Sequence, residues 1–259
     1  MKKLVYLLTI LLLMNGCYKD EDLLKTAILD DPSAMIVFCQ RAPADTLRKV
    51  SYEYSNNNLI AETIFNNGEI IDKTTFDYNS DNQLIFETYV TNLQVVEKSY
   101  IYNELNQLIN IKYKFTDYNA DGQISNESES DAPREYQNNQ LVKEWESWGG
   151  FNTYEYKNGK VVTKINYTKS GEKHHFTYYT YSGDLLIEEK KETNVGGLMY
   201  LKTYTYDSQN RLIQIRDREN IIEENDYNDK KLIEKRTYYF GIDPGFDVCY
   251  GNYIYRYEY

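Results

Sequence analysis

A tyrosine, a short polar run and an apolar pair recur in the same order along most of this chain. The clearest copy is YDSQNRLI, and eight copies align on their first tyrosine. They begin at Tyr54, Tyr78, Tyr102, Tyr136, Tyr156, Tyr181, Tyr206 and Tyr227, with a degenerate ninth, YNADGQI, at Tyr118. The spacing of 16 to 25 residues accommodates two short strands and two turns. The chain is therefore predicted to be a tandem array of β-hairpins.

Pairs of tyrosines two residues apart precede several of the polar runs. The pairs are Tyr52 with Tyr54, Tyr100 with Tyr102, Tyr154 with Tyr156, and Tyr204 with Tyr206. Because residues i and i+2 of a strand share a face, each pair presents two rings to one side of the sheet. Neighbouring copies are expected to align these rings in an aromatic ladder, in which each cross-strand pair contributes about 0.2–1 kcal/mol.

The polar runs are rich in Asn, Asp, Ser and Gly, which favour hairpin turns. Each run is followed by an apolar pair such as Leu59-Ile60 or Leu212-Ile213. Neighbours on a regular strand point to opposite faces, so both faces of the sheet are expected to carry apolar area, which favours a sheet that rolls up. We therefore predict an all-β fold in which tandem antiparallel hairpins form a rolled or barrel-like meander sheet.

The repeat resembles the YD repeat of rearrangement-hotspot (RHS) proteins, with YTYDSQNRLI as the best match. The resemblance extends from about residue 48 to Tyr259. The turn glycine of that family is present as Gly122 and Gly159 and is replaced by asparagine at 82, 106 and 210, a residue that also tolerates the left-handed conformation. In long RHS proteins such repeats form a shell around a passenger toxin. This chain is too short for that, so the resemblance implies a strand-turn-strand array and not encapsulation.

Two segments interrupt the array. Residues 125–135, SNESESDAPRE, are acidic with one proline and are expected to form an exposed loop. Residues 241–251, GIDPGFDVCYG, are expected to form a second loop before a closing strand, NYIYRYEY. That strand has tyrosines at alternate positions, so we expect it to pair within the sheet and not to fray.

The N-terminus has the pattern of a signal peptide. Lys2 and Lys3 precede an apolar run of 11 residues, which is too short for a membrane-spanning helix of about 20. Gly16 followed by Cys17 resembles the bacterial lipoprotein signal, in which the cysteine is acylated with palmitate-type chains and becomes the first residue. The alternative is an ordinary secretory signal with an incidental cysteine.

The sequence after Cys17, YKDEDLLK, is expected to be a solvated spacer, and it resembles the acidic stretch that directs Bacteroidetes lipoproteins to the cell surface. We divide the chain into a signal peptide at 1–16, the lipidated cysteine with its spacer and an N-terminal segment at 17–45, and the repeat domain at 46–259. The expected location is the outer membrane, on its cell-surface or periplasmic face, with a lipid anchor at Cys17.

Charge and cysteine content restrict the partners. The net charge is −11, and cleavage before Cys17 would remove Lys2 and Lys3 and leave −13. Such a surface repels polyphosphate, so we expect no nucleic-acid partner. Once Cys17 carries lipid, Cys39 and Cys249 remain, and in an oxidising envelope they either form a disulfide or stay as two separate buried thiols.

Metal and cofactor chemistry have little support. Asp117, Asn119 and Asp121 match the first half of a calcium loop, but its twelfth position, where a bidentate Glu belongs, is Ser128, so a solvated turn is favoured. His174 and His175, the two histidines of the chain, are adjacent and are expected to face opposite ways on a strand, towards solvent. We therefore expect no metal and no cofactor.

Trp145 and Trp148 are the two tryptophans, in KEWESWGGF beside a Gly-Gly turn. They are the candidate ligand-binding residues, because a sugar ring stacks well on an indole face. Their odd spacing would place them on opposite faces of a regular strand, so packing within the hairpin is the competing interpretation.

No catalytic motif stands out, and forty acidic residues make many carboxylate pairs without marking one. We therefore expect a non-enzymatic, lipid-anchored cell-envelope interaction or structural protein built of YD-like repeats, with a glycan or an envelope protein as its possible partner. The alternatives are a glycan-binding surface lipoprotein and an envelope hydrolase with an unrecognised carboxylate pair.

Overall fold

Eighteen strands make up the regular structure of the residues that the computed structural model describes, which are 33–39, 42–66, 68–238 and 253–258. For residues 38–39, 42–47 and 253 it describes the backbone alone. The strands are β1 Ala34–Cys39, β2 Ala42–Ser55, β3 Asn58–Asn66, β4 Glu69–Tyr78, β5 Leu84–Thr91, β6 Gln94–Tyr102, β7 Leu108–Tyr118, β8 Ile124–Gln137, β9 Gln140–Trp145, β10 Phe151–Lys157, β11 Lys160–Tyr167, β12 Lys173–Ser182, β13 Leu185–Thr193, β14 Leu198–Tyr206, β15 Leu212–Asp217, β16 Asn220–Asn228, β17 Lys231–Thr237 and β18 Tyr253–Glu258. Within those residues no helix has the length and apolar character needed to cross a membrane.

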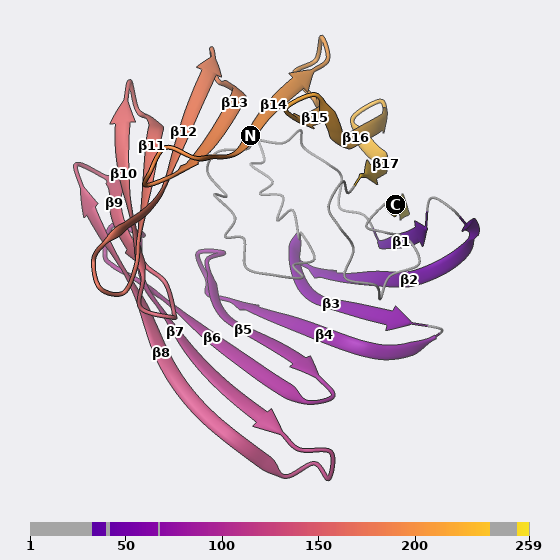
Figure 1. Cartoon of the computed structure of the whole chain (residues 1–259). Coiled ribbons are helices and arrows are strands. Elements are labelled where there is room, and N and C mark those ends of the chain that lie inside the picture. The colour runs from indigo at the N-terminus through magenta and orange to yellow at the C-terminus, as the bar shows by residue number, and fades with distance from the viewer. Residues whose placement is uncertain (1–32, 40–41, 67, 239–252, 259) are drawn as a thin grey trace. The chain divides into compact units, whose positions relative to one another are not determined.

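The chain divides into two compact units. Unit 2 comprises residues 48–178 and 191–197, and its strands follow one another as an antiparallel meander from β2 to β12. Figure 1 shows β3 to β8 as a continuous, strongly curved sheet. The predicted all-β fold of tandem antiparallel hairpins in a rolled sheet is confirmed in this unit.

Unit 1 comprises residues 1–47, 179–190 and 198–259. Its strands β14 to β18 are also antiparallel neighbours in chain order. The closing strand β18 pairs with β17 on one edge and with β1 on the other, from Ala34↔Glu258 to Cys39↔Tyr253. The prediction that the tyrosine-rich last segment is a paired strand is therefore confirmed.

Left-handed residues close the predicted turns. Asn82, Asn106 and Asn210 have φ of 60°, 61° and 61°, and Gly122 and Gly159 have φ of 75° and 79°. Asparagine reaches this region at lower cost than most residues that carry a Cβ. Asparagine thus substitutes for the turn glycine as the sequence predicted.

The acidic residue of the YD motif caps its own turn. Asp207 Oδ1 accepts hydrogen bonds from the backbone N–H of Gln209 at 2.8 Å and of Arg211 at 3.0 Å, and Oδ2 accepts one from Arg211 Nε at 2.6 Å. These bonds, led by the one from the Arg211 backbone, lower the pKa of Asp207. Asn79 and Asn103 accept the same two backbone bonds in their copies. The residue after the tyrosine is therefore a turn-forming residue in each of these repeats.

In seven of the eight copies the apolar pair after the turn is the site of a β-bulge. In the copy at Tyr227, this tyrosine lies opposite Leu232 and Asp226 lies opposite Glu234, which leaves Ile233 without a cross-strand partner. Leu232 is 8% exposed and Ile233 is 42% exposed. The other extra residues are Ile60, Ile85, Ile109, Val142, Val162 and Ile213. The prediction treated the pairs as regular strand, whereas an extra residue in these seven copies bends the strand and adds local twist, which also promotes a curved sheet.

The predicted loop at 125–135 is wrong. These residues belong to β8, which pairs with β7 from Asn110↔Pro133 to Tyr118↔Ile124. A strand with exposed side chains tolerates many carboxylates, and proline is tolerated where its missing N–H faces away from the ladder. The turn after Tyr118 has the expected local form, but it joins β7 to β8, at the opposite end of the strands from the turns after Tyr102 and Tyr136.

Several predictions lie outside the described residues. These are the signal peptide at 1–16, the lipidation site Cys17, the loop at 241–251 and Cys249. Cys39 ends β1, but its side chain is not among those described, so the Cys39–Cys249 disulfide stays a prediction.

Candidate functional site

The repeat tyrosines join neighbouring hairpins through their hydroxyls. Six of the eight donate a hydrogen bond to the backbone carbonyl of a leucine in the preceding copy, at 2.8–3.0 Å. We call these bonds the tyrosine–carbonyl bonds. The pairs are Tyr78 with Leu59, Tyr102 with Leu84, Tyr136 with Leu108, Tyr156 with Leu141, Tyr206 with Leu186, and Tyr227 with Leu212.

The surroundings of two of these phenols, those of Tyr78 and Tyr206, disfavour the ionised form. Burial, followed by the charge of Glu87 and the neighbouring Tyr102, raises the pKa of Tyr78. Burial also raises the pKa of Tyr206. The phenols of Tyr78 and Tyr206 therefore stay protonated, and able to donate, above their ordinary pKa of about 10.

The tyrosine two residues earlier has a different acceptor. Tyr100 donates to Glu87 Oε2 at 2.7 Å, Tyr204 donates to Glu189 Oε2 at 2.7 Å, and Tyr154 donates to Glu144 Oε1. Burial raises the pKa of Tyr204, and the Glu189 carboxylate raises it further. In all three copies the glutamate lies three residues after the leucine that supplies the carbonyl, at 84, 141 and 186. Each of these copies thus contains a buried or half-buried tyrosine–glutamate pair.

Phe76 occupies the same place as Tyr100, Tyr154 and Tyr204, and Glu62 occupies the place of their glutamates. Phe76 is 6% exposed and Glu62 is 4% exposed. Phe76→Tyr is expected to raise the free energy of unfolding by about 1 kcal/mol, because the new hydroxyl can donate to the Glu62 carboxylate. Urea denaturation would measure it. The matched control introduces Phe76→Tyr into the Glu62→Leu variant. If the free energy of unfolding rises there by the same amount, relative to Glu62→Leu alone, the hydroxyl does not act through Glu62.

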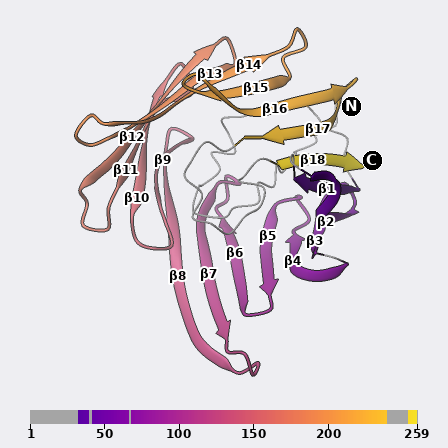
Figure 2. The ribbon, with the colours of Figure 1, turned by 45° about the vertical axis from the view of Figure 1, so that its right-hand side comes forward.

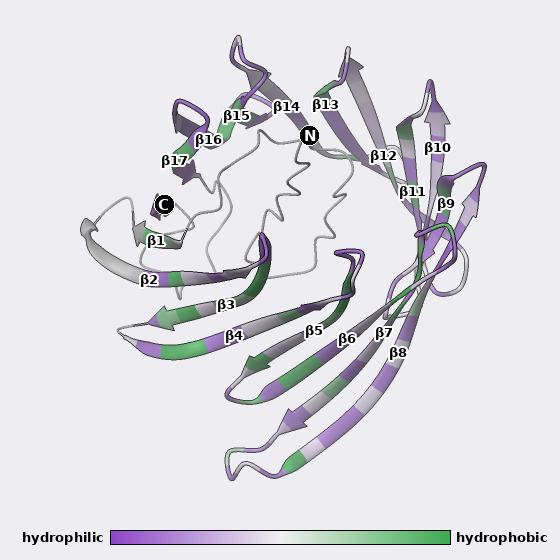
Figure 3. Cartoon of the chain, turned by 180° about the vertical axis from the view of Figure 1, so that it is seen from behind, coloured by the Kyte–Doolittle hydropathy of each residue, from purple (hydrophilic) through white to green (hydrophobic). Residues whose placement is uncertain are grey.

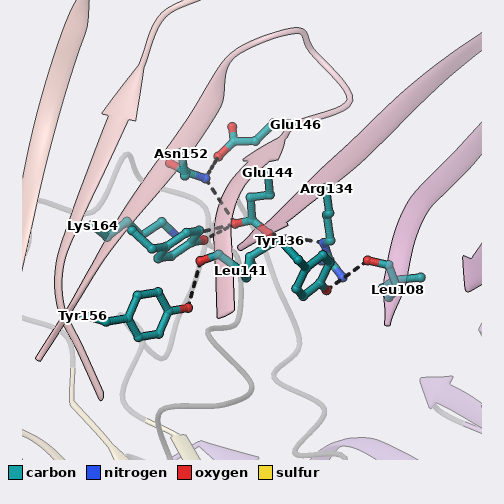
Figure 4. Close-up of polar contacts among 10 residues, drawn as sticks. Leu108, Arg134, Tyr136, Leu141, Glu144, Glu146, Asn152, Tyr156 and Lys164 are labelled. Carbon is teal, nitrogen blue, oxygen red and sulfur yellow. Dashed lines mark hydrogen bonds and ion pairs between the residues drawn. The ribbon is translucent and has the colours of Figure 1, made fainter. Parts of the chain in front are cut away.

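Three of the buried polar side chains of unit 2, Asn152, Glu144 and Glu146, lie together where β9 pairs with β10 (Figure 4). Asn152 is fully buried, and its Nδ2 donates to Glu146 Oε1 at 2.8 Å and to Glu144 Oε1 at 3.3 Å. Its Oδ1 accepts from Asn166 Nδ2 at 2.9 Å. The amide therefore holds two carboxylates that lie two residues apart on one face of the chain.

Two cations lie beside Glu144. Arg134 Nε is 3.4 Å from Glu144 Oε2, and Lys164 Nζ is 4.0 Å from Glu144 Oε1. With Glu146, Asn152, Tyr154 and Asn166 these residues form what we call the Asn152 cluster; Figure 4 labels Arg134, Glu144, Glu146, Asn152 and Lys164. Buried carboxylates are stable only when they are paired and hydrogen-bonded, and the cluster supplies both conditions for Glu144.

Glu144 and Glu146 are the kind of carboxylate pair that the hydrolase alternative requires. Their exposed fractions are 6% and 7%, so neither is open to a substrate in this conformation. Their hydrogen bonds go to the amide and phenol of neighbouring strands, and the arrangement favours a role in holding strands together.

The tryptophans differ in their surroundings. Trp145 ends β9, lies 6.1 Å from Phe151 between ring centroids, and has Lys143 Nζ 3.9 Å from its ring centroid. Trp148 lies in the turn that follows, so the alternation of a strand does not apply to it. Its ring packs on Gly150, where an added Cβ would lie 1.9 Å from the indole, and it is 51% exposed. Trp145 thus packs within the hairpin, whereas Trp148 presents an indole to solvent.

The histidine prediction is wrong in its geometry. The rings of His174 and His175 lie 3.7 Å apart between centroids, instead of on opposite faces. The cause is a bulge in which Tyr167 pairs with Lys173 and Asn166 pairs with His175, which leaves His174 as the extra residue. Burial, then the charge of Lys191 and then His174, lower the pKa of His175.

The residues that match the first half of a calcium loop form the turn between β7 and β8. Asn119 Oδ1 accepts from the backbone N–H of Asp121 at 3.1 Å and of Gln123 at 2.9 Å. Hydrogen bonds from Gln94 and then Asn126 lower the pKa of Asp117. In the described part of the chain, no three His, Cys, Asp or Glu side chains are arranged to hold a metal ion.

Comparisons with known proteins add likenesses of fold alone. No protein-family model matches the chain, and no curated protein matches it. A chain of the TcdB2-TccC3-Cdc42 structure is similar to 74% of this chain, with 12% identity and a TM-score of 0.29, and the match spans 12% of that longer chain. A chain of the TcdB2-TccC3-TEV structure is similar to 73% of this chain, with 12% identity and a TM-score of 0.28, and the match spans 12% of that chain. A porin-like protein from Bacteroides uniformis ATCC 8492 is similar to 66% of this chain, with 13% identity and a TM-score of 0.41, over 93% of its own length.

Proposed function

We propose that this chain is a non-enzymatic, lipid-anchored cell-envelope protein whose repeats form a rigid structural or interaction module. One observation carries the proposal: the distinctive polar side chains of the repeat are used within the sheet. The phenols donate to backbone carbonyls and to glutamates of neighbouring hairpins, and the Asp or Asn after the tyrosine caps the turn. Such a sheet is a scaffold, and its function lies in what its surface and anchor contact.

The anchor is tested by metabolic labelling with a palmitate analogue in a bacterial host. The full chain is expected to label and to fractionate with membranes, whereas Cys17→Ala is expected to lose the label and to leave the membrane fraction. Cys39→Ala is the matched control and should keep the label. Labelling that survives Cys17→Ala, or that is absent from the full chain, would contradict the lipid anchor.

A glycan-binding role is the second candidate, and the exposed indole of Trp148 favours it. A polysaccharide that stacks on this ring would quench tryptophan fluorescence. The quenching should disappear in Trp148→Ala and persist in Trp145→Phe, because Lys143 and Phe151 already pack against the Trp145 ring. Equal quenching in both variants would argue against this site.

A further inference from the structure

The strand β8 has an edge that is paired over only part of its length. On one side it pairs with β7 along Ile124–Pro133, and on the other side β9 pairs only with residues 134–137. Among the described strands of unit 2, none pairs with the second edge of residues 124–133. Figures 1 and 2 both show the half of β8 that begins at Ile124 with β7 on one side and no other strand of unit 2 on the other. In an antiparallel strand about every second residue directs its N–H and C=O to such an edge.

The side chains along this edge have a regular pattern. Glu127, Glu129 and Asp131 alternate along β8, so they share one face, and all three are exposed. The other face carries Asn126, Ser128 and Ser130. Figure 3 shows β8 as mostly hydrophilic along its length. The edge therefore combines open backbone groups with a row of negative charge.

The paired edge of the same strand shows which side chains complement that row. On β7, Lys112 lies directly opposite Asp131 and Lys114 lies opposite Glu129. Lys114 Nζ is 3.6 Å from Glu127 Oε1, on the diagonal. Lysines at alternate positions of an adjacent strand thus already match the carboxylates of β8 from one side. Cross-strand pairs of opposite charge stabilise a sheet, and like charges destabilise it.

We propose that the second edge of β8, from Ser125 to Asp131, binds an extended basic segment of a partner protein by strand addition, with Lys or Arg at alternate positions. The backbone of the segment completes the ladder of β8, and its cations lie against Glu127, Glu129 and Asp131 as Lys112 and Lys114 do from β7. A second copy of this chain is a poor occupant, because pairing two β8 edges would bring two acidic rows together. This inference rests on the proposed interaction role, and it specifies the partner as a protein with an extended basic segment.

The probe is a short synthetic peptide in which Lys alternates with Thr, labelled for fluorescence anisotropy and added to the full-length chain in detergent. Binding is expected to weaken about tenfold in Glu127→Gln/Glu129→Gln/Asp131→Asn, which keeps the side-chain shapes and removes the charges. The matched control, Glu69→Gln/Asp81→Asn/Glu155→Gln, neutralises three exposed carboxylates elsewhere in unit 2 and should bind like the unmodified chain. Equal weakening in both variants would overturn the site in favour of general charge attraction.

Strand addition itself is tested with two N-methylated versions of the peptide. One version is methylated at the odd backbone amides and the other at the even ones, so each blocks hydrogen bonds along one edge of the peptide. One version is expected to lose binding at least tenfold and the other to retain it, because only one edge of the peptide faces β8. Equal binding by both versions, or no binding of the parent peptide, would overturn the inference. Palmitate labelling of Cys17 is unaffected by that result, so the anchored-scaffold proposal is judged separately.

Discussion

Asn152→Leu is expected to lower the free energy of unfolding by about 3–5 kcal/mol, the largest effect among the variants considered for this chain. Asn152 is fully buried, and its amide donates to both Glu144 and Glu146 and accepts from Asn166. Leucine has the same number of side-chain heavy atoms but no polar atom, so the buried carboxylates of Glu144 and Glu146 and the half-buried amide of Asn166 would each lose a partner. Urea denaturation followed by tyrosine fluorescence and circular dichroism would measure the change.

Two further variants separate the network from packing alone. Asn166→Leu removes one member of the Asn152 cluster and should cost less than Asn152→Leu, because it breaks one bond to Asn152 instead of three. A cost below about 1 kcal/mol for Asn152→Leu would show that the hydrogen bonds of its amide do not hold the strands together.

Asn152→Asp adds a dependence on pH with a defined sign. The introduced carboxyl lies beside the carboxylates of Glu144 and Glu146, so its pKa rises in the folded chain above its unfolded value. A group with a raised folded pKa binds protons more tightly in the native state, so stability falls as pH rises through that range. The deficit of Asn152→Asp relative to the unmodified chain is therefore expected to grow from mildly acidic to alkaline pH.

The triple variant Tyr102→Phe/Tyr136→Phe/Tyr156→Phe is expected to lower the free energy of unfolding by about 3 kcal/mol. Each change removes one tyrosine–carbonyl bond while keeping the ring, and each such bond contributes about 1 kcal/mol. The three sites lie on different strands of unit 2, so their effects should add approximately. The urea midpoint should fall while the slope stays constant.

Tyr118→Phe is the matched control for that variant. Tyr118 also precedes a polar turn, but this turn lies at the opposite end of the strands, and its hydroxyl makes no tyrosine–carbonyl bond with the described residues. Its loss should change the stability by less than about 0.5 kcal/mol. If the control costs as much as each member of the triple variant, the hydroxyl bonds have no special role.

Much of the architecture follows from local chemistry that the sequence displays. The polar runs predicted the turns, and asparagine at 82, 106 and 210 adopts the left-handed conformation that the missing glycine required. The alternation of tyrosines in the last segment predicted β18. These features depend on a few neighbouring residues, so a single sequence is sufficient to predict them.

The features that the sequence did not predict depend on partners in other strands. The acidic residues of β8 suggested a loop, but Lys112 and Lys114 of β7 lie opposite them and allow a strand. The stacking of His174 on His175 depends on a bulge set by the register of β11 with β12. The role of Glu144 required Tyr154 and Asn152 to lie beside it.

A sequence signal for part of the polar network was nevertheless present. Glu87, Glu144 and Glu189 each lie three residues after the leucine of their repeat. The next copy in each case has a second tyrosine two residues before its repeat tyrosine, at 100, 154 and 204. Aligning the copies beyond the turn would have paired these residues. Asn152 and Asn166 have no equivalent in the other copies, so repetition could not have identified them.

The most direct test of the account is a pH titration of the individual tyrosines by NMR, with ¹³C at the ring carbon that bears the hydroxyl. Tyr78, Tyr204 and Tyr206 are expected to stay protonated above the ordinary pKa of about 10, and burial and the hydrogen bond to Glu224 raise the pKa of Tyr238 to about 12. Since these pKa values are raised by folding, stability should be retained below pH of about 10 and lost as these phenols ionise above it. Ionisation of Tyr78, Tyr204 and Tyr206 near pH 10 in the folded chain would contradict the claim that the repeat holds its phenols within the sheet.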